Sequence, residues 1–360
     1  MLSCDVKFNG VVRCDARATA GGGTLEMRGF SAIDGGSAHI GDGGGVYIKS
    51  GALIMRAQSE IRNSYASVNG ASVFMLHGTV DMYDRSAVRR GYAANCGGAM
   101  TIIYGHATQH DDSIVDSCSS GSHGGGYCAI QSAIITLAGR AVVINCSIPT
   151  TRGGGKGGAC YIDSGAGAAA GGRVRDIAID CRVPTYPLLP PRAGASFILS
   201  QSATVERCYA SLQGGAVYAT YGALFTSTGG TIRACVAPEG GALFLVGYVF
   251  THLTTATVIS NTIFLQNAAL VTGGALFLSA GGVSISGCTF DRNVARFGGG
   301  LSIQDTITTV ANCVFTDNGA TAGGAMQVAG VSACAQAVSF GGGRAWLAQY
   351  DSAVQAAALF

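Results

Sequence analysis

Residues 264–278 read FLQNAALVTGGALFL, and two motifs in this stretch decide the fold. The first motif, Phe264-Leu-Gln-Asn267, ends in a polar residue. The second, Gly273-Gly-Ala-Leu-Phe-Leu278, opens with two glycines and continues with apolar residues at its fourth and sixth positions. An alternation with a period of two over so short a run is typical of a strand with one buried face. The paired glycines supply a turn conformation that other residues resist.

The glycine motif recurs along the whole chain, most often after 25 to 27 residues. Segments with helical spacing are absent between the copies. A unit of this size that contains only short strands is one coil of a solenoid. The sequence therefore predicts an all-β fold, a parallel β-helix of about 11 coils. The copies begin at Gly43, Gly70, Gly97, Gly124, Gly157, Gly194, Gly214, Gly240, Gly273, Gly298 and Gly323.

The repeat sets the expected domain organisation. We expect the β-helix to span residues 36–330, with residues 1–35 as an irregular N-terminal end or cap. Residues 331–360 are expected to form a C-terminal cap or tail, because the open end of a solenoid needs a cover. Trp346, Tyr350 and Val354 are spaced as in a short amphipathic helix.

Composition excludes several classes of protein. Hydrophobic residues make up 48% of the 360 residues, enough for a large core, and a net charge of +2 gives no reason to expect nucleic acid as a partner. The longest apolar run, Ala242–Phe250, is too short to span a membrane. The start of the chain, Met1–Lys7, carries charges where a secretory signal would be apolar, so we expect no signal peptide and no transmembrane segment in this chain.

A polar or cysteine residue follows each second strand in the same place of the coil. Stacked asparagines at this place are expected to exchange amide hydrogen bonds. Stacked cysteines could form a disulfide or metal ladder, but the strand spacing of about 4.8 Å exceeds the Cβ separation of about 3.8 Å that a disulfide prefers. We therefore expect small buried hydrophobic residues, no metal and no cofactor. The predicted ladder consists of Cys118, Cys146, Cys181, Cys208, Cys235, Asn267, Asn293 and Asn318.

The combination of Gly-Gly-Ala-apolar with Phe-x-x-Asn resembles the repeats of chlamydial polymorphic outer membrane proteins. The resemblance covers about residues 36–328 and is clearest between Phe264 and Met326. It implies a right-handed β-helix of the pectin-lyase-like type, a role as an autotransporter passenger in adhesion, and a place outside the cell or on its surface.

We therefore expect a non-enzymatic surface or secreted protein that binds a glycan or a protein partner; its oligomeric state is open. Two long insertions are candidate binding loops, carrying Arg152 and Lys156 in one and Tyr186 and Arg192 in the other, although insertions are often merely tolerated and solvated. The outward fifth position of the glycine motif forms a candidate aromatic stripe, or alternatively a stabilising surface stack. The stripe comprises Tyr47, Phe74, Tyr161, Tyr218, Phe244 and Phe277.

An enzyme is the alternative, because polysaccharide lyases and glycoside hydrolases share the pectin-lyase-like fold. Such an enzyme needs convergent carboxylates or a basic residue on one exposed groove. The best local candidates are His110, Asp111, Asp112 and His123. A polar turn between strands explains the same residues without chemistry.

Overall fold

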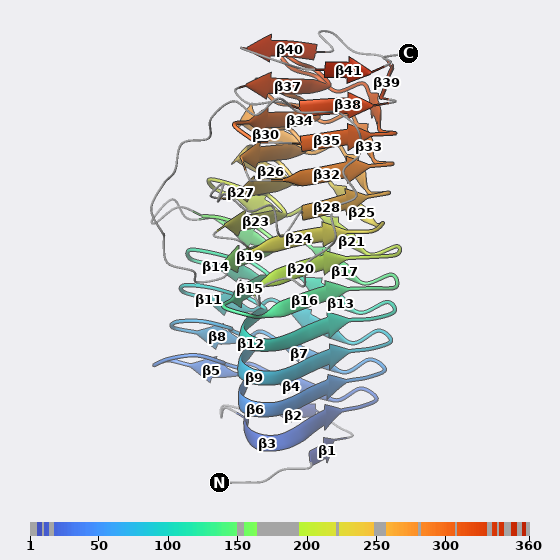
Figure 1. Ribbon diagram of the computed structural model, residues 1–360. Helices are drawn as coiled ribbons and strands as arrows, with labels where there is room; N and C mark the ends of the chain where they lie inside the picture. Colours follow the sequence, from blue (N-terminus) through green and yellow to red (C-terminus); the bar gives the residue numbers. More distant parts are fainter. Residues whose placement is uncertain are drawn as a thin grey trace.

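In the computed structural model, strands make up more than half of the described residues. The described residues are 6–8, 11–13, 18–149, 155–163, 194–220, 223–247, 257–279, 282–306, 308–329, 333–336, 338–341, 347–350 and 355–357. Throughout these ranges the secondary structure is β, in three sheets whose pairings are all parallel. The coils stack into one elongated solenoid, with the two ends of the chain at opposite ends of the stack (Figure 1). The fold is therefore the parallel β-helix that the repeat predicts.

Sheet A contains 21 strands in two adjoining columns. In the early coils one ten-residue strand covers both columns: β3 (Ala18–Met27), β6 (Val46–Met55), β9 (Val73–Met82) and β12 (Met100–Gln109). The first column continues with β15 (Tyr127–Ile130), β19 (Cys160–Asp163), β23 (Val217–Thr220), β27 (Leu243–Val246), β31 (Leu276–Ser279), β34 (Leu301–Gln304), β37 (Met326–Ala329) and β40 (Leu347–Tyr350). The second contains β1 (Val6–Phe8), β16 (Ile134–Leu137), β20 (Ser196–Leu199), β24 (Leu224–Ser227), β28 (Thr257–Ser260), β32 (Val283–Ser286), β35 (Thr308–Ala311), β38 (Ala333–Gln336) and β41 (Gln355–Ala357).

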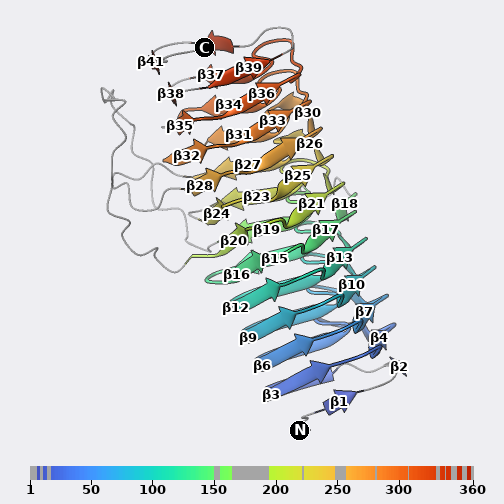
Figure 2. The same cartoon turned by 90° about the vertical axis from the view of Figure 1, so that its right-hand side faces the viewer.

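Sheets B and C form the other sides of the solenoid (Figure 2). Sheet B has twelve short strands. They are β2 (Val11–Arg13), β4 (Ala32–Asp34), β7 (Glu60–Arg62), β10 (Ala87–Arg89), β13 (Ile114–Asp116), β17 (Val142–Ile144), β21 (Thr204–Glu206), β25 (Thr231–Arg233), β29 (Ile263–Leu265), β33 (Thr289–Asp291), β36 (Val314–Thr316) and β39 (Ser339–Gly341). Sheet C has eight, namely β5 (Ser37–Ala38), β8 (Tyr65–Ala66), β11 (Tyr92–Ala93), β14 (Ser119–Ser120), β18 (Ser147–Ile148), β22 (Tyr209–Ala210), β26 (Val236–Glu239) and β30 (Ala268–Thr272).

The glycine motif makes the corner that leads into sheet A, except at Gly194, where the prediction of a coil start is wrong because the motif leads into β20 in the second column. Its first glycine takes a left-handed backbone conformation, as at Gly124 (φ 58°). A Cβ there would collide with the carbonyl oxygen of Tyr127. The fourth and sixth positions that follow, such as Val46 and Ile48, are fully buried. The motif thus turns the chain and starts the core in six residues.

Both ends of the chain extend the stack further than the sequence predicts. Strand β1 pairs with β3, and β2 pairs with β4, so coils begin before residue 36. The short helix expected around residues 346–354 is absent where the chain is described, because Leu347–Tyr350 is strand β40 on β37. The open edge of a sheet offers unpaired backbone groups, and pairing with them overrides the local helical spacing. Trp346 and Val354 lie outside the described residues.

The ladder between sheets B and C changes chemistry along the stack. The thiols of Cys118, Cys146, Cys208 and Cys235 are free and buried, and burial raises the pKa of the Cys118 and Cys208 thiols well above the usual range. In the following coils Asn267 donates from Nδ2 to Oδ1 of Asn293 at 3.0 Å, and Asn293 does the same to Asn318 at 3.0 Å. Cys181 lies outside the described residues, and its predicted place between Cys146 and Cys208 is wrong, because β17 pairs directly with β21.

Candidate functional site

Two columns of side chains line the corner where each coil enters sheet A. The first column consists of the residue just before the glycine motif, and isolated parallel bridges join Cys96 to His123 and His123 to Lys156. The second column is the fifth position of the motif, where Cys128 pairs with Tyr161 and Tyr161 pairs with Tyr218 in β15, β19 and β23. The residues of both columns change from coil to coil.

Members of the two columns contact one another across successive coils. The ring centroids of His123 and Tyr161 are 4.5 Å apart with a tilt of 59°. One coil further, Lys156 donates from Nζ to the hydroxyl of Tyr218 at 3.1 Å and lies 4.5 Å from the centroid of that ring. The two contacts place an imidazole, two phenols and an ammonium group side by side at the edge of sheet A.

Electrostatics around His123 favour its neutral form. Burial lowers the pKa of the imidazole, and the charge of Lys156 lowers it further, whereas Asp163 opposes the shift. The Oγ of Ser122 lies 2.7 Å from Nδ1 of His123, which fixes one ring nitrogen and orients the other. A neutral, oriented imidazole is suited to accept a proton near neutral pH.

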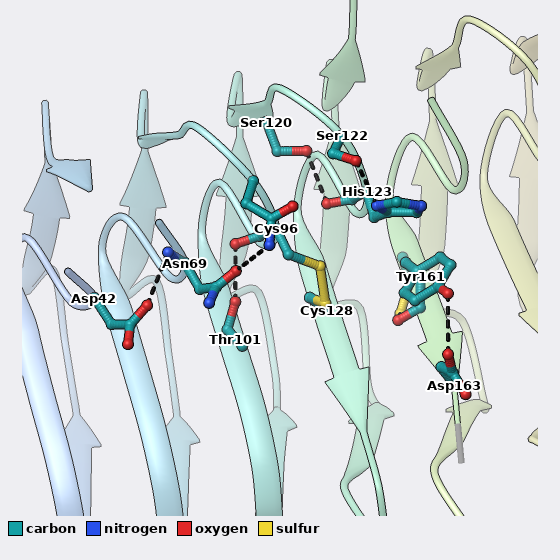
Figure 3. The surroundings of a disulfide bond; sticks show 12 residues. Asp42, Asn69, Cys96, Thr101, Ser120, Ser122, His123, Cys128, Tyr161 and Asp163 are labelled. Carbon is teal, nitrogen blue, oxygen red and sulfur yellow. Dashed lines mark hydrogen bonds between the residues drawn. A yellow bond between two sulfur atoms is a disulfide. The ribbon is translucent and has the colours of Figure 1, made fainter. Parts of the chain in front are cut away.

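Asp163 and Tyr161 stand on the same strand, β19. The hydroxyl of Tyr161 donates to Oδ2 of Asp163 at 3.1 Å (Figure 3). Two residues apart on a strand, their side chains project from the same face of sheet A. The carboxylate therefore holds the phenol in place beside His123.

A disulfide lies one coil before this cluster. Cys96 and Cys128 are bonded, with their Cα atoms 5.9 Å apart, and in Figure 3 they lie directly beside His123 and Tyr161. The other described cysteines with placed side chains are free thiols. Within the described part of the chain no group of three or more His, Cys, Asp or Glu side chains gathers as metal ligands.

The aromatic stripe is present, but most of it is not an outer surface. Successive rings stack with centroids 5.5 Å apart for Tyr161 and Tyr218, 5.5 Å for Tyr218 and Phe244, and 4.6 Å for Phe244 and Phe277. Phe74, Tyr218, Phe244 and Phe277 are buried, whereas Tyr47 and Tyr161 are half-buried. The expectation of an external stripe is wrong for the four buried rings, because stacking in register covers the ring faces. Of the two stripe residues near His123 and Lys156, Tyr161 is partly exposed, whereas Tyr218 is buried.

The candidate enzyme residues of the sequence do not converge. His110, Asp111 and Asp112 form the turn after β12, at the far edge of sheet A from His123. There Arg140 donates from Nε to Oδ1 of Asp112 at 2.6 Å, and this contact lowers the pKa of the Asp112 carboxyl. The ring of His110 stacks on Tyr83 at 4.5 Å. These residues form a stabilised turn rather than a site.

Of the predicted binding loops, only Lys156 is described, and it belongs to the His123 cluster. Arg152, Tyr186 and Arg192 lie outside the described residues. Sequence reasoning missed Asp163 and the Cys96–Cys128 bond. A signal for Asp163 was its place two residues after Tyr161 on the same strand. The disulfide had no local signal, because its two cysteines occupy different columns and are 32 residues apart.

No family model and no curated protein sequence matches the chain. Among solved structures it is similar to the A-module of the Azotobacter vinelandii mannuronan C-5 epimerase AlgE6, with 14% identity and a TM-score of 0.41. The match covers 93% of this chain and 89% of that one. A similarity at this level transfers no activity to this chain.

One expectation from the sequence differs from this finding. We expected a protein that is not an enzyme, whereas the similar structure is a module of a mannuronan C-5 epimerase, and the expectation is not kept. The comparisons also give no specific support to the resemblance to chlamydial repeats. The β-helix itself is shown by the parallel strand pairings of the three sheets.

Proposed function

We propose that the protein is a carbohydrate-active enzyme that removes a proton beside the carboxylate of a uronic acid in an acidic polysaccharide, as a polysaccharide lyase does. The observation that carries this proposal is the cluster of His123, Lys156, Tyr161 and Asp163 on adjoining coils. All four residues are half-buried, so they are partly open to solvent at the edge of sheet A.

The reaction needs a base and a positive charge. In the proposed elimination, Nε2 of His123 takes the proton on C5 of a uronate, and the electrons of the C–H bond form a C4=C5 double bond. The C4–O bond breaks, and the leaving oxygen takes the proton of the Tyr161 hydroxyl. Lys156 stabilises the negative charge that builds up on the uronate carboxylate during proton removal.

The supporting contacts match these roles. Ser122 holds Nδ1 of His123, so Nε2 is the nitrogen assigned to the proton. The lowered pKa of His123 keeps the base unprotonated at neutral pH. Asp163 orients the phenol of Tyr161, and Tyr218 fixes the ammonium group of Lys156.

Elimination fits this cluster better than hydrolysis. Most glycoside hydrolases place two carboxyl groups across the bond that is broken. Here an imidazole, a phenol and an ammonium group accompany the carboxylate of Asp163. The substrate class follows from the ammonium group, which pairs with a uronate and gives no advantage with a neutral sugar.

A location outside the cytoplasm is part of the same proposal. Disulfides persist in oxidising compartments and are rare in reducing ones. The buried Cys96–Cys128 bond supports such a compartment, which is also where acidic polysaccharides are met.

The test is incubation of the protein with alginate, polygalacturonate and hyaluronan in D2O. Ultraviolet absorbance would detect unsaturated uronates, and mass spectrometry would detect deuterium at C5. We expect activity on at least one polymer and a loss of about 10²–10⁴-fold in the His123→Gln variant, because the base is removed. Tyr161→Phe should lose elimination but retain part of the deuterium exchange.

The matched control is His110→Gln, which replaces a histidine at the opposite edge of sheet A and should keep full activity. Lys156→Arg should retain more activity than Lys156→Met, since it keeps the charge. The proposal is wrong if none of the three polymers reacts, or if His123→Gln is as active as the wild type.

A further inference from the structure

The disulfide and the cluster share one geometric relation. In three successive coils the first-column residue contacts the second-column residue of the following coil. Cys96 is bonded to Cys128 in this way, the ring of His123 contacts that of Tyr161, and Lys156 contacts Tyr218. The disulfide is therefore the covalent member of a series whose next two members form the candidate site.

The backbone next to Cys96 also carries His123. The N–H of His123 donates to the carbonyl of Asn95 at 3.0 Å, and the N–H of Gly97 donates to the carbonyl of His123 at 3.1 Å. The backbone N–H and the backbone carbonyl of His123 are thus both bonded to the two chain neighbours of Cys96. We expect a displacement of Cys96 to shift the backbone of His123, because these two hydrogen bonds join the two segments.

The second half of the bond neighbours Tyr161 in sheet A. Cys128 pairs with Tyr161 in the register of β15 and β19. Cys96 and Cys128 are 4% and 0% exposed, so the bond is enclosed by packed side chains. The hydroxyl of Thr101 donates to the carbonyl of Cys96 at 2.9 Å and fixes this peptide from within the same coil.

We infer that the Cys96–Cys128 disulfide is a positioning element that sets the separation of His123 and Tyr161. This inference rests on the proposed function for its effect on activity, but not for its effect on the geometry. The bond does not touch the substrate. It holds the two columns together at the coil where a base and an acid must face each other.

The preceding coil provides the matched variant. There the first-column residue is Asn69, and the second-column residue of the following coil is Thr101. The double variant Cys96→Asn/Cys128→Thr therefore places in this coil two residues that the solenoid already accepts one coil earlier. Cys288→Ala/Cys313→Ala is the control, because it removes two buried free thiols far from the cluster.

The first measurement is the titration of the His123 imidazole by NMR, with the resonance assigned through His123→Gln. In Cys96→Asn/Cys128→Thr we expect the pKa of His123 to move back up toward its ordinary value, because a looser corner admits water. The control should leave the titration unchanged. An unaltered titration in the Cys96→Asn/Cys128→Thr protein overturns the inference, whatever the activity.

The second measurement is C5 deuterium exchange on the polymer that the wild type uses. We expect kcat to fall at least tenfold with a smaller change in KM, since positioning rather than binding is lost. Unchanged kcat would also overturn the inference. If the wild type has no activity, the proposed function fails, whereas the titration still decides the role of the disulfide. If Cys96→Asn/Cys128→Thr does not fold, reduction of the wild type followed by the same titration takes its place.

Discussion

Two corners of the same coil follow opposite rules. At the corner between sheets B and C the ladder repeats one residue type over several coils, cysteine from Cys118 to Cys235 and asparagine from Asn267 to Asn318. At the corner before sheet A, the residues that stack directly on one another are Asn69, Cys96, His123, Lys156, Gln213 and Glu239. A repeated column gives identical contacts in each coil and serves stability, whereas a varied column can assemble different chemical groups.

The largest expected effect concerns another repeated column, the stacked phenylalanine side chains of sheet B. Phe290 is fully buried and stacks on Phe264 and Phe315 at 5.0 and 4.5 Å. Phe290→Ala should lower the free energy of unfolding by about 3–5 kcal/mol, because it leaves a cavity in the core. Chemical denaturation would measure this loss in the free energy of unfolding. The control Leu270→Ala removes a side chain that is 74% exposed and should cost less than about 0.5 kcal/mol.

The second prediction compares the two ladder chemistries. Oδ1 of Asn293 accepts from the backbone N–H of Asn267 at 2.9 Å, and its Nδ2 donates to the carbonyl of Phe264 at 2.9 Å. Asn293→Ala leaves these buried groups without partners and should cost about 3 kcal/mol. Cys208→Ala should cost only about 1 kcal/mol, since the thiol acts mainly as a small hydrophobic group. Equal losses in the two variants would contradict the distinction between an amide ladder and a packed thiol column.

The third prediction concerns how stability depends on pH through His123, at the corner before sheet A. The pKa of His123 is lowered in the folded protein, so the unfolded chain binds the proton more tightly. The stabilisation is therefore complete above the unfolded pKa of about 6.5 and is lost as the pH falls through the folded value. Wild type should lose stability over this window relative to His123→Gln, as denaturation at several pH values would detect. Lys156→Met should reduce the difference, because one cause of the lowered pKa is gone.

The smallest effect is expected at the turn where sequence reasoning placed the acids. Asp112 and Arg140 are exposed and form an ion pair at 2.6 Å. Exposed pairs contribute little to stability. Asp112→Asn should change neither the thermal midpoint nor activity on polyuronates by a measurable amount. A clear loss of activity in this variant would move the site to the opposite edge of sheet A.

The candidate site was only partly predictable. The sequence selected His123, Lys156 and Tyr161, but it assigned them to three separate features, a polar turn, a loop and an aromatic stripe. Their meeting depends on the register of β15, β19 and β23, which the spacing between motifs defines only within a few residues. His110 and Asp112 looked like better partners for His123, because they are close in sequence and the width of sheet A is not visible there.

The sequence by itself determined the parallel β-helix. The period near 26 residues, the glycines at each corner and the alternation of Val46 and Ile48 admit few other arrangements. These features are local, and each coil repeats them. Only the tertiary structure decided which side chains meet across coils, including the Cys96–Cys128 bond and the contact of His123 with Tyr161. The physical reason is that stacking acts between residues one coil apart, and contacts at that range depend on the registration of whole coils rather than on any short motif.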